Sequence, residues 1–198
     1  MAMLPDVRTW GSTVDERRLP YPCDRHLPVF DDAVYRAVDV AAPPAILFRW
    51  LCQLRVAPYS YDWIDNLGRQ SPRRLIAGLD QLRVGQHMMG FELVEFEHDR
   101  HMTLHGTFGY FGTYAVTYLI IPAAAGCRLA VKLLMAYPRP IVLHYLFASL
   151  GPPADFVMMR KQLLTLKELA ERDTATAQCS PPGSVSQRAA TNQTLIAP

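Results

Sequence analysis

Residues 85–137 read as consecutive strands joined by short turns, and this run constrains the fold more than any other feature of the sequence. Its apolar, aromatic and β-branched residues predict strands at 88–97, 102–108, 113–121 and 127–137. The turns at 98–101 and 122–126 are too short for the crossover connections that parallel strands need. The segment therefore predicts an antiparallel meander.

Helical patterns flank this meander. After it, residues 139–150 predict a first helical piece, and Pro153 begins a strong helix that runs to about Asp173. Apolar residues at steps of three and four share one face of that helix: Phe156, Met159, Leu163, Leu166 and Ala170. Before the meander, residues 33–40 predict a strand, residues 45–54 an amphipathic helix, and residues 60–68 a short second helix. Together these elements predict an α+β fold.

The order of the elements divides the 198 residues into three parts. Residues 1–31 mix prolines with charges of both signs and predict an irregular arm, which we expect to lie on the domain. Residues 32–173 predict the folded domain. Residues 174–198 contain one charged residue, Arg188, among small and polar ones, and predict a disordered tail.

Charge and cysteine content narrow the class of protein. A formal net charge of +2 gives no electrostatic reason to expect nucleic acid or an anionic membrane as a partner. Four cysteines without a C-x-x-C pair favour a reducing cytoplasm over a disulfide framework. We expect no signal peptide, and no membrane span at 141–150, because that apolar run is too short.

Alternation along the strands predicts which side chains face the long helix. In 127–137 the inner face carries Leu129, Val131, Leu133, Met135 and Tyr137, opposite Arg128 and Lys132. We expect the inner face of 113–121 to carry Tyr114, Val116, Tyr118 and Ile120. An apolar surface with a few tyrosine hydroxyls is typical of a small-molecule cavity. A filled core that needs no ligand explains the same pattern equally well.

The whole span 33–172 resembles the helix-grip superfamily. The resemblance is carried by residues 38–44 leading into 46–51, by residues 156–169, and by the agreement in element order. The superfamily includes START lipid-transfer domains, the birch-pollen-allergen family and polyketide cyclase-like proteins (SRPBCC). The stretch 59–74 is similar to that of uncharacterised bacterial members. The resemblance implies a curved antiparallel sheet wrapped around a long C-terminal helix, two short helices after the first strand, and a cavity that opens near the second of these. It implies no fixed catalytic set.

Candidate chemical groups are few, and each has a structural explanation. Asp62 and Asp65 flank Trp63, which suits an acid or base near the cavity, or simply helix capping. His98, His101 and His105 lie near acidic residues, but a solvated hairpin tip explains them better than a metal site. Likewise Arg69, Arg73 and Arg74 favour a solvated basic loop over an anion site. The interleaved glycines Gly106, Gly109 and Gly112 lack the context of a phosphate or dinucleotide loop, and we expect no metal and no cofactor.

Three hypotheses of function follow. In the leading one the protein binds, as carrier or sensor, a hydrophobic small molecule such as a lipid, an aromatic compound or a polyketide. We expect nine residues to line its site: Trp63, Phe108, Tyr114, Tyr118, Met135, Tyr137, Phe156, Met159 and Leu163. The first alternative is a cyclase, dehydratase or hydrolase acting in the same cavity, with Asp62, Asp65, His87 or a tyrosine as acid or base. The second is a protein-interaction module with a filled core, whose arm and tail bind a partner.

Overall fold

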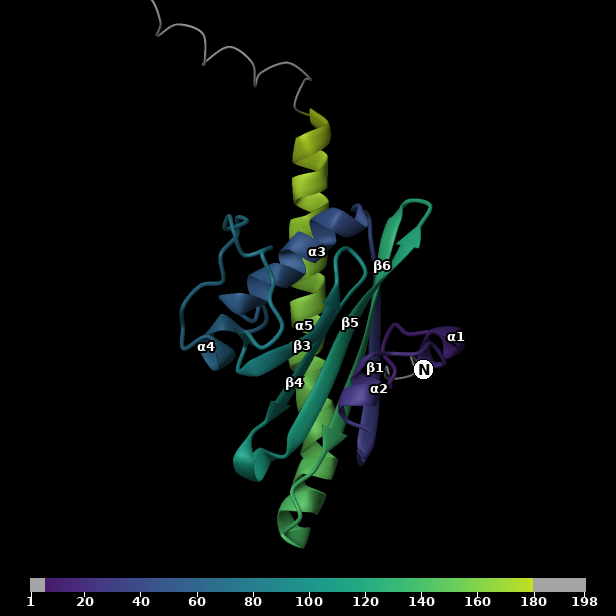
Figure 1. Cartoon of the computed structure of the whole chain (residues 1–198), viewed down its shortest axis with the longest axis vertical. Coiled ribbons are helices and arrows are strands. Elements are labelled where there is room, and N and C mark those ends of the chain that lie inside the picture. Colours follow the sequence, from purple (N-terminus) through teal and green to yellow (C-terminus); the bar gives the residue numbers. More distant parts are fainter. Residues whose placement is uncertain (1–5, 180–198) are drawn as a thin grey trace, which may run out of the picture.

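The computed structural model describes residues 6–179 and has the helix-grip architecture that the element order predicts (Figure 1). A six-stranded antiparallel sheet wraps around a long C-terminal helix, with short helices after the first strand. The helices and strands are α1 Val14–Arg17, α2 Cys23–His26, β1 Asp32–Val40, α3 Pro44–Cys52, η1 Gln53–Arg55, α4 Asp62–Asp65, β2 His87–Met88, β3 Phe91–Glu97, β4 His101–Thr107, η2 Gly109–Phe111, β5 Thr113–Ala123, β6 Gly126–Ala136 and α5 Ile141–Cys179.

The sheet is the predicted meander with the first strand added at its far edge. The strand order is β1-β6-β5-β4-β3-β2, and every neighbouring pair is antiparallel. β1 pairs with β6 along its whole length, from Asp32 opposite Met135 to Val40 opposite Cys127. The strand expected at 88–97 is two strands, because Met89 and Gly90 both have positive φ, 53° and 83°. Such a pair forms a tight hairpin turn between β2 and β3.

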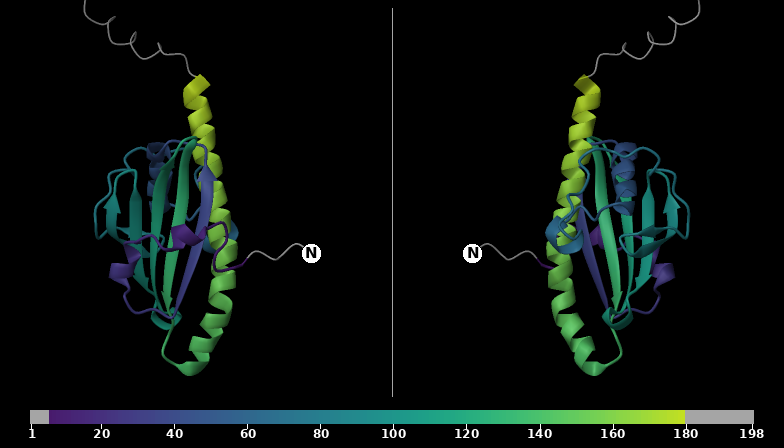
Figure 2. Two further views of the ribbon diagram at one scale, coloured as in Figure 1. Left: turned by 90° about the vertical axis from the view of Figure 1, so that its right-hand side faces the viewer. Right: turned by 90° about the vertical axis from the view of Figure 1, so that its left-hand side faces the viewer.

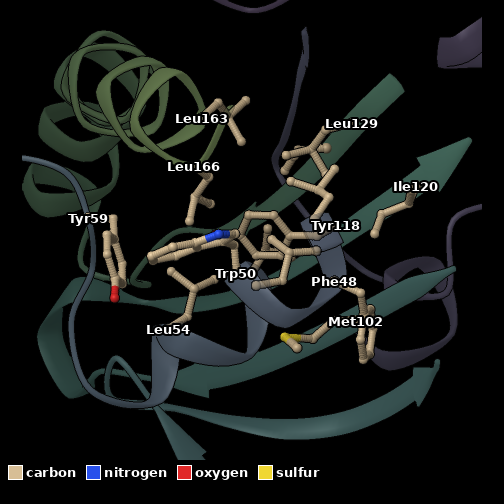
Figure 3. Close-up of a cluster of buried hydrophobic side chains, with 14 of the residues drawn as sticks. Phe48, Trp50, Leu54, Tyr59, Met102, Tyr118, Ile120, Leu129, Leu163 and Leu166 are labelled. Atoms are coloured by element: carbon tan, nitrogen blue, oxygen red, sulfur yellow. The ribbon is translucent and has the colours of Figure 1, made fainter. Parts of the chain in front are cut away.

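The inner face of the sheet is the one that alternation predicts. The side chains expected on the inner faces of β5 and β6 belong to the main hydrophobic core. α3 and the second half of α5 complete this core with Trp50, Leu163 and Leu166, all of which have no exposed surface (Figure 3). The Nε1 of Trp50 donates a hydrogen bond to Asp173 Oδ2 at 3.1 Å, which fixes α3 against α5.

Residues 19–27 of the N-terminal segment pack on the opposite, outer face of the sheet, whereas residues 8–10 run along the edge strand β1 (Figure 1). The segment was expected to be irregular, but it contains the one-turn helices α1 and α2. The backbone N–H of Cys23 donates to Thr117 Oγ1 on β5 at 2.9 Å, and Lys132 of β6 pairs with Asp24 at 2.5 Å. These polar residues on the outer face of β5 and β6 therefore contact the N-terminal segment rather than solvent.

α5 is one continuous helix, which corrects the expected break at residues 151–153. Pro152 and Pro153 lie inside it, and it continues past Asp173 to Cys179. The remaining part of the expected tail, 180–198, lies outside the described residues. Figure 2 shows α5 running the whole length of the sheet. Its second half therefore supplies core residues, and its first half reaches the far end of the domain.

The first half of α5 is apolar and exposed. By length and composition alone, one 18-residue window of the helix qualifies as a membrane span, and only 6% of that window is buried. The window is long enough because the helix does not stop at Gly151, and the expected absence of a membrane span stays a prediction. The second half of the same helix packs into the core of the domain. Exposed apolar residues at this end of the molecule include Tyr110, Phe111, Ile141, Val142, Tyr145 and Leu146.

Candidate functional site: two adjoining cavities under the C-terminal helix

Two cavities lie between the inner face of the sheet and α5. The first has a volume of about 320 Å³ and is lined by Pro58, Ser60, Met89, Phe91, Val116, Tyr118, Leu133, Asp155, Met158, Met159 and Gln162. The second has a volume of about 380 Å³ and is lined by Phe91, Phe108, Tyr114, Leu133, Met135, Phe147, Leu150, Gly151, Ala154 and Asp155. Phe91, Leu133 and Asp155 line both, so the two cavities adjoin at these residues.

Glycines leave room for the aromatic wall of the second cavity. A Cβ at Gly106 would lie 2.8 Å from the ring of Phe108, and that ring packs against Phe91 with centroids 4.9 Å apart. Gly112 has φ +100°, and a Cβ there would meet the carbonyl oxygen of Ala136 at 2.3 Å. A side chain would clash at either position, at Gly106 with the ring of Phe108 and at Gly112 with the backbone of Ala136. Gly106 thus makes room for the ring of Phe108 in the cavity wall, and Gly112 lets the chain before β5 pass close to the end of β6.

The polar groups of the first cavity bond mainly to one another. The buried hydroxyl of Tyr118 donates to Gln162 Oε1 at 2.7 Å, and Gln162 Nε2 donates to the carbonyl oxygen of Pro58 at 2.7 Å. Burial raises the pKa of Tyr118 well above its usual value, so its hydroxyl stays protonated. These two hydrogen bonds connect β5 to α5 and to the loop before α4.

A buried ion pair sits where the two cavities meet. Arg36 on β1 donates from Nη2 to Asp155 Oδ2 on α5 at 2.8 Å, and the two side chains are 1% and 13% exposed. Burial raises the pKa of Asp155 to about 6, although the neighbouring Arg36 lowers it. Burial also lowers the pKa of Arg36. Both shifts mean that loss of hydration outweighs the attraction within the pair.

Sequence reasoning missed Arg36 and Asp155, although the sequence carries a signal for each. Arg36 interrupts an alternating inner face of β1 made of Val34, Val38 and Val40. Asp155 lies four residues before Met159, on the apolar side of the predicted helix. A charged residue on each of two apolar faces is the pattern that would have drawn attention to them.

The structure distributes the nine expected ligand-binding residues over several places. Phe108, Tyr114 and Met135 line the second cavity, whereas Tyr118 and Met159 line the first. Leu163 is fully buried in the core below the first cavity. Their contact with a ligand stays a prediction.

The other three expected residues line neither of these two cavities. Phe156 packs against Trp10 with centroids 6.2 Å apart, and it lies 5.6 Å from the guanidinium of Arg36. Tyr137 lines a separate groove of about 690 Å³ near η2 and the start of α5, where its hydroxyl lies 3.4 Å from Asp32 Oδ2. Trp63 is 75% exposed on α4. The single turn of α4 gives its large ring little to pack against.

The other chemical candidates lie away from these cavities. Asp62 accepts two hydrogen bonds from Ser71, from its N–H and its hydroxyl, at 3.0 and 2.5 Å. His87 is exposed on β2. Arg73 lies 3.7 Å from Glu168 of α5, both at the surface.

Glu95 on β3 lies close to His101 of the same hairpin and to two residues of α2. Glu95 lies 3.0 Å from His26 and 3.4 Å from His101, and it also binds Arg25. Across residues 6–179, no group of three or more His, Cys, Asp or Glu side chains is arranged to hold a metal ion.

Comparison with known proteins supports the fold. No protein-family model matches the sequence, and no curated protein sequence matches it significantly. Among solved structures, the fold is similar to that of StfQ, a di-domain ARO/CYC protein from the steffimycin biosynthetic pathway, with a TM-score of 0.51 and 10% identity. That similarity covers 72% of this chain and 51% of StfQ, so the chain spans about half of the di-domain protein.

Other similar structures are weaker matches. Protein CV1439 from Chromobacterium violaceum has a TM-score of 0.46 at 14% identity over 70% of this chain and 96% of its own. Protein TTHA0849 from Thermus thermophilus has a TM-score of 0.45 at 18% identity over 75% of this chain and 100% of its own.

Proposed function

We propose that this protein binds an apolar small molecule in the two adjoining cavities between the sheet and α5. The observation that supports this most directly is the composition of the lining: among the residues that line the two cavities, Asp155 alone is charged, and most of the others are apolar. Ligand sites usually combine an apolar wall with a few placed polar groups. The cavity volumes favour a binding protein over a module with a filled core.

The helix-grip fold is consistent with this function. A likeness to StfQ at 10% identity shows the fold alone. The proposal therefore rests on the cavities of this chain and takes no support from the ARO/CYC name of StfQ. Neither the cavities nor the likeness to StfQ identifies the ligand as a lipid, an aromatic compound or a polyketide. The cytoplasm as its location stays a prediction from the sequence.

The first test asks whether the purified protein carries a ligand. We would denature it and search the released material by mass spectrometry for an apolar small molecule. A stoichiometric ligand supports the proposal and identifies the substrate class. An empty protein that also fails to bind phenanthrene, whose own fluorescence reports binding, contradicts it.

A pair of variants on α5 locates the binding site. Ala154→Phe adds a ring to the wall of the second cavity, whereas Val157→Phe adds the same ring to a side chain that is 49% exposed and lines neither cavity. We expect Ala154→Phe to weaken phenanthrene binding by roughly tenfold, because the ring occupies ligand volume. Val157→Phe is the matched control and keeps the affinity. Equal affinity in both variants contradicts binding in the second cavity.

A second candidate function, an enzyme of the cyclase, dehydratase or hydrolase type, is favoured by Asp155. Its pKa of about 6 places proton exchange close to neutral pH, as a general acid or base needs. Asp62 and His87, which the sequence suggested, line neither cavity, whereas Asp155 lines both. If turnover of a released ligand is found, its rate is expected to fall in Asp155→Asn and to be unchanged in Asp62→Asn.

A further inference from the structure

The polar groups that line the two cavities differ in how many hydrogen bonds they still have available. Tyr118 donates to Gln162, and both ends of the Gln162 amide are bonded, to Tyr118 and to Pro58. The Tyr114 hydroxyl donates to the carbonyl oxygen of Phe111 at 2.5 Å. The donors of these three side chains are therefore engaged, and the acceptors that they keep are uncharged oxygens.

Asp155 is different because the acceptor that it retains is a charged carboxylate. In the described part of the chain its one hydrogen bond comes from Arg36, to Oδ2. An ionised carboxylate has about four acceptor sites, so Oδ1 and a second lone pair of Oδ2 are available. Asp155 is also among the three residues that line both cavities, with Phe91 and Leu133. The charged acceptor therefore lies at the junction and not at either end.

We propose that the ligand is a neutral apolar molecule that carries a hydroxyl group near its middle, and that Asp155 accepts the hydrogen bond from this hydroxyl. The inference rests on the proposed binding function and specifies the chemistry of the ligand. One apolar part of the molecule occupies the first cavity beside Met89 and Met159, and the other occupies the second cavity beside Phe108 and Phe147.

The charge at the junction favours a neutral donor over a charged one. Arg36 at 2.8 Å neutralises Asp155, so the pair as a whole offers no net charge to an amine or to a carboxylate. An ionised carboxylate accepts hydrogen bonds and donates none, so a ligand carbonyl at this place would find no donor on Asp155. A polycyclic phenol, or a secondary alcohol with two hydrocarbon arms, is uncharged and carries a hydrogen-bond donor, so it fits both conditions. A long chain with a single polar end places its polar group away from the junction.

The test compares probes that differ in the donor. 9-Phenanthrol carries the hydroxyl, 9-methoxyphenanthrene replaces it by an ether, and phenanthrene has neither. We expect the wild type to bind 9-phenanthrol roughly tenfold more tightly than the other two, which corresponds to one hydrogen bond to a mostly buried charged acceptor. Fluorescence titration and calorimetry measure the three affinities.

Two variants and one control assign the preference to Asp155. Asp155→Asn keeps the size of the side chain and removes the charge, and the double variant Arg36→Met/Asp155→Leu removes the ion pair without leaving a buried charge. In both, we expect 9-phenanthrol to lose roughly tenfold in affinity while the ether and phenanthrene change by less than about threefold. Glu168→Gln, a surface change on the same helix with a side chain 69% exposed, keeps the wild-type preference.

The outcomes separate this inference from the function it rests on. If all three probes bind the wild type equally, or if the preference for 9-phenanthrol persists in both Asp155 variants, the proposed role of Asp155 is wrong while the binding function stands. If no probe binds the wild type and no ligand co-purifies, the binding function itself is wrong and the inference falls with it.

Discussion

Removing either member of the Arg36–Asp155 pair is expected to cost more stability than removing both. The two side chains are 1% and 13% exposed, so a single substitution leaves its partner buried without a counter-charge. Breaking a buried pair in this way typically costs about 3–5 kcal/mol, whereas replacing both members by apolar residues is often neutral or stabilising. The variants are Arg36→Met, Asp155→Leu and the combination of the two.

The structure also gives the order of the two single variants. A guanidinium stays charged at any accessible pH, and Arg36 Nε is already buried without a partner among the described residues. Asp155→Leu therefore leaves a charge that cannot be neutralised, and we expect it to be the more damaging change. In Arg36→Met the remaining carboxyl can bind a proton, since burial already raises its pKa to about 6 beside the arginine. Protonation limits the cost of this variant.

Urea denaturation followed by circular dichroism at pH 7 measures the three changes in the free energy of unfolding. We expect about 3–5 kcal/mol for Asp155→Leu, less for Arg36→Met, and a double variant within about 1 kcal/mol of the wild type. Single variants that each cost less than about 1 kcal/mol, or a double variant as unstable as Asp155→Leu, would refute the reasoning.

Three further predictions concern other features. The pKa of Asp155 is about 6 in the folded state against 3.8 for the free side chain, so between these pH values the folded protein holds a proton that the unfolded chain releases. Relative to Asp155→Asn, the wild type should therefore gain about 3 kcal/mol of stability as the pH falls from 7 to below 4. A stability difference that does not depend on pH in urea titrations would contradict this. Gly112→Ala should destabilise the protein by more than about 2 kcal/mol, because its Cβ would meet a backbone oxygen at 2.3 Å. Gly109→Ala has open space around it at a φ of +52° and should cost about 1 kcal/mol. Thermal melting of both variants measures the difference. Burial raises the pKa of three thiols, those of Cys23, Cys52 and Cys127, to about 11 or 12. Iodoacetamide at pH 8 should therefore modify them only after unfolding. Alkylation of these cysteines in native protein, detected by peptide mass spectrometry, would contradict this.

Alternation and turn length made the sheet predictable. Side chains on a strand alternate between two faces, so Leu133 and Tyr118 could be placed on the inner face without knowing the partner strands. The split of the strand at 88–97 was not predicted, because Met89 takes a positive φ that the local sequence does not require. The continuity of α5 was missed for a similar reason: Gly151-Pro152-Pro153 usually ends a helix, and only the tertiary structure shows that this helix continues.

The candidate site could be predicted only in part. Phe108, Tyr114, Tyr118, Met135 and Met159 follow from strand and helix periodicity, because each lies on a face that must turn inward. The meeting of Arg36 with Asp155 could not be predicted, because 119 residues separate them and no local pattern fixes which charged residues pair. Trp63 was placed at the cavity because the resemblance implies an opening near the second short helix, but Trp63 lines neither cavity and the one-turn helix α4 leaves it at the surface.

A crystal structure of the wild type grown with phenanthrene tests most directly whether the two cavities hold an apolar molecule. We expect the ring system between Leu133 of β6 and Ala154 of α5, with Phe91 and Asp155 at its edge. A structure in which α5 packs directly on the sheet, with side chains filling both volumes and the probe absent or bound only at the surface, would contradict the proposed function.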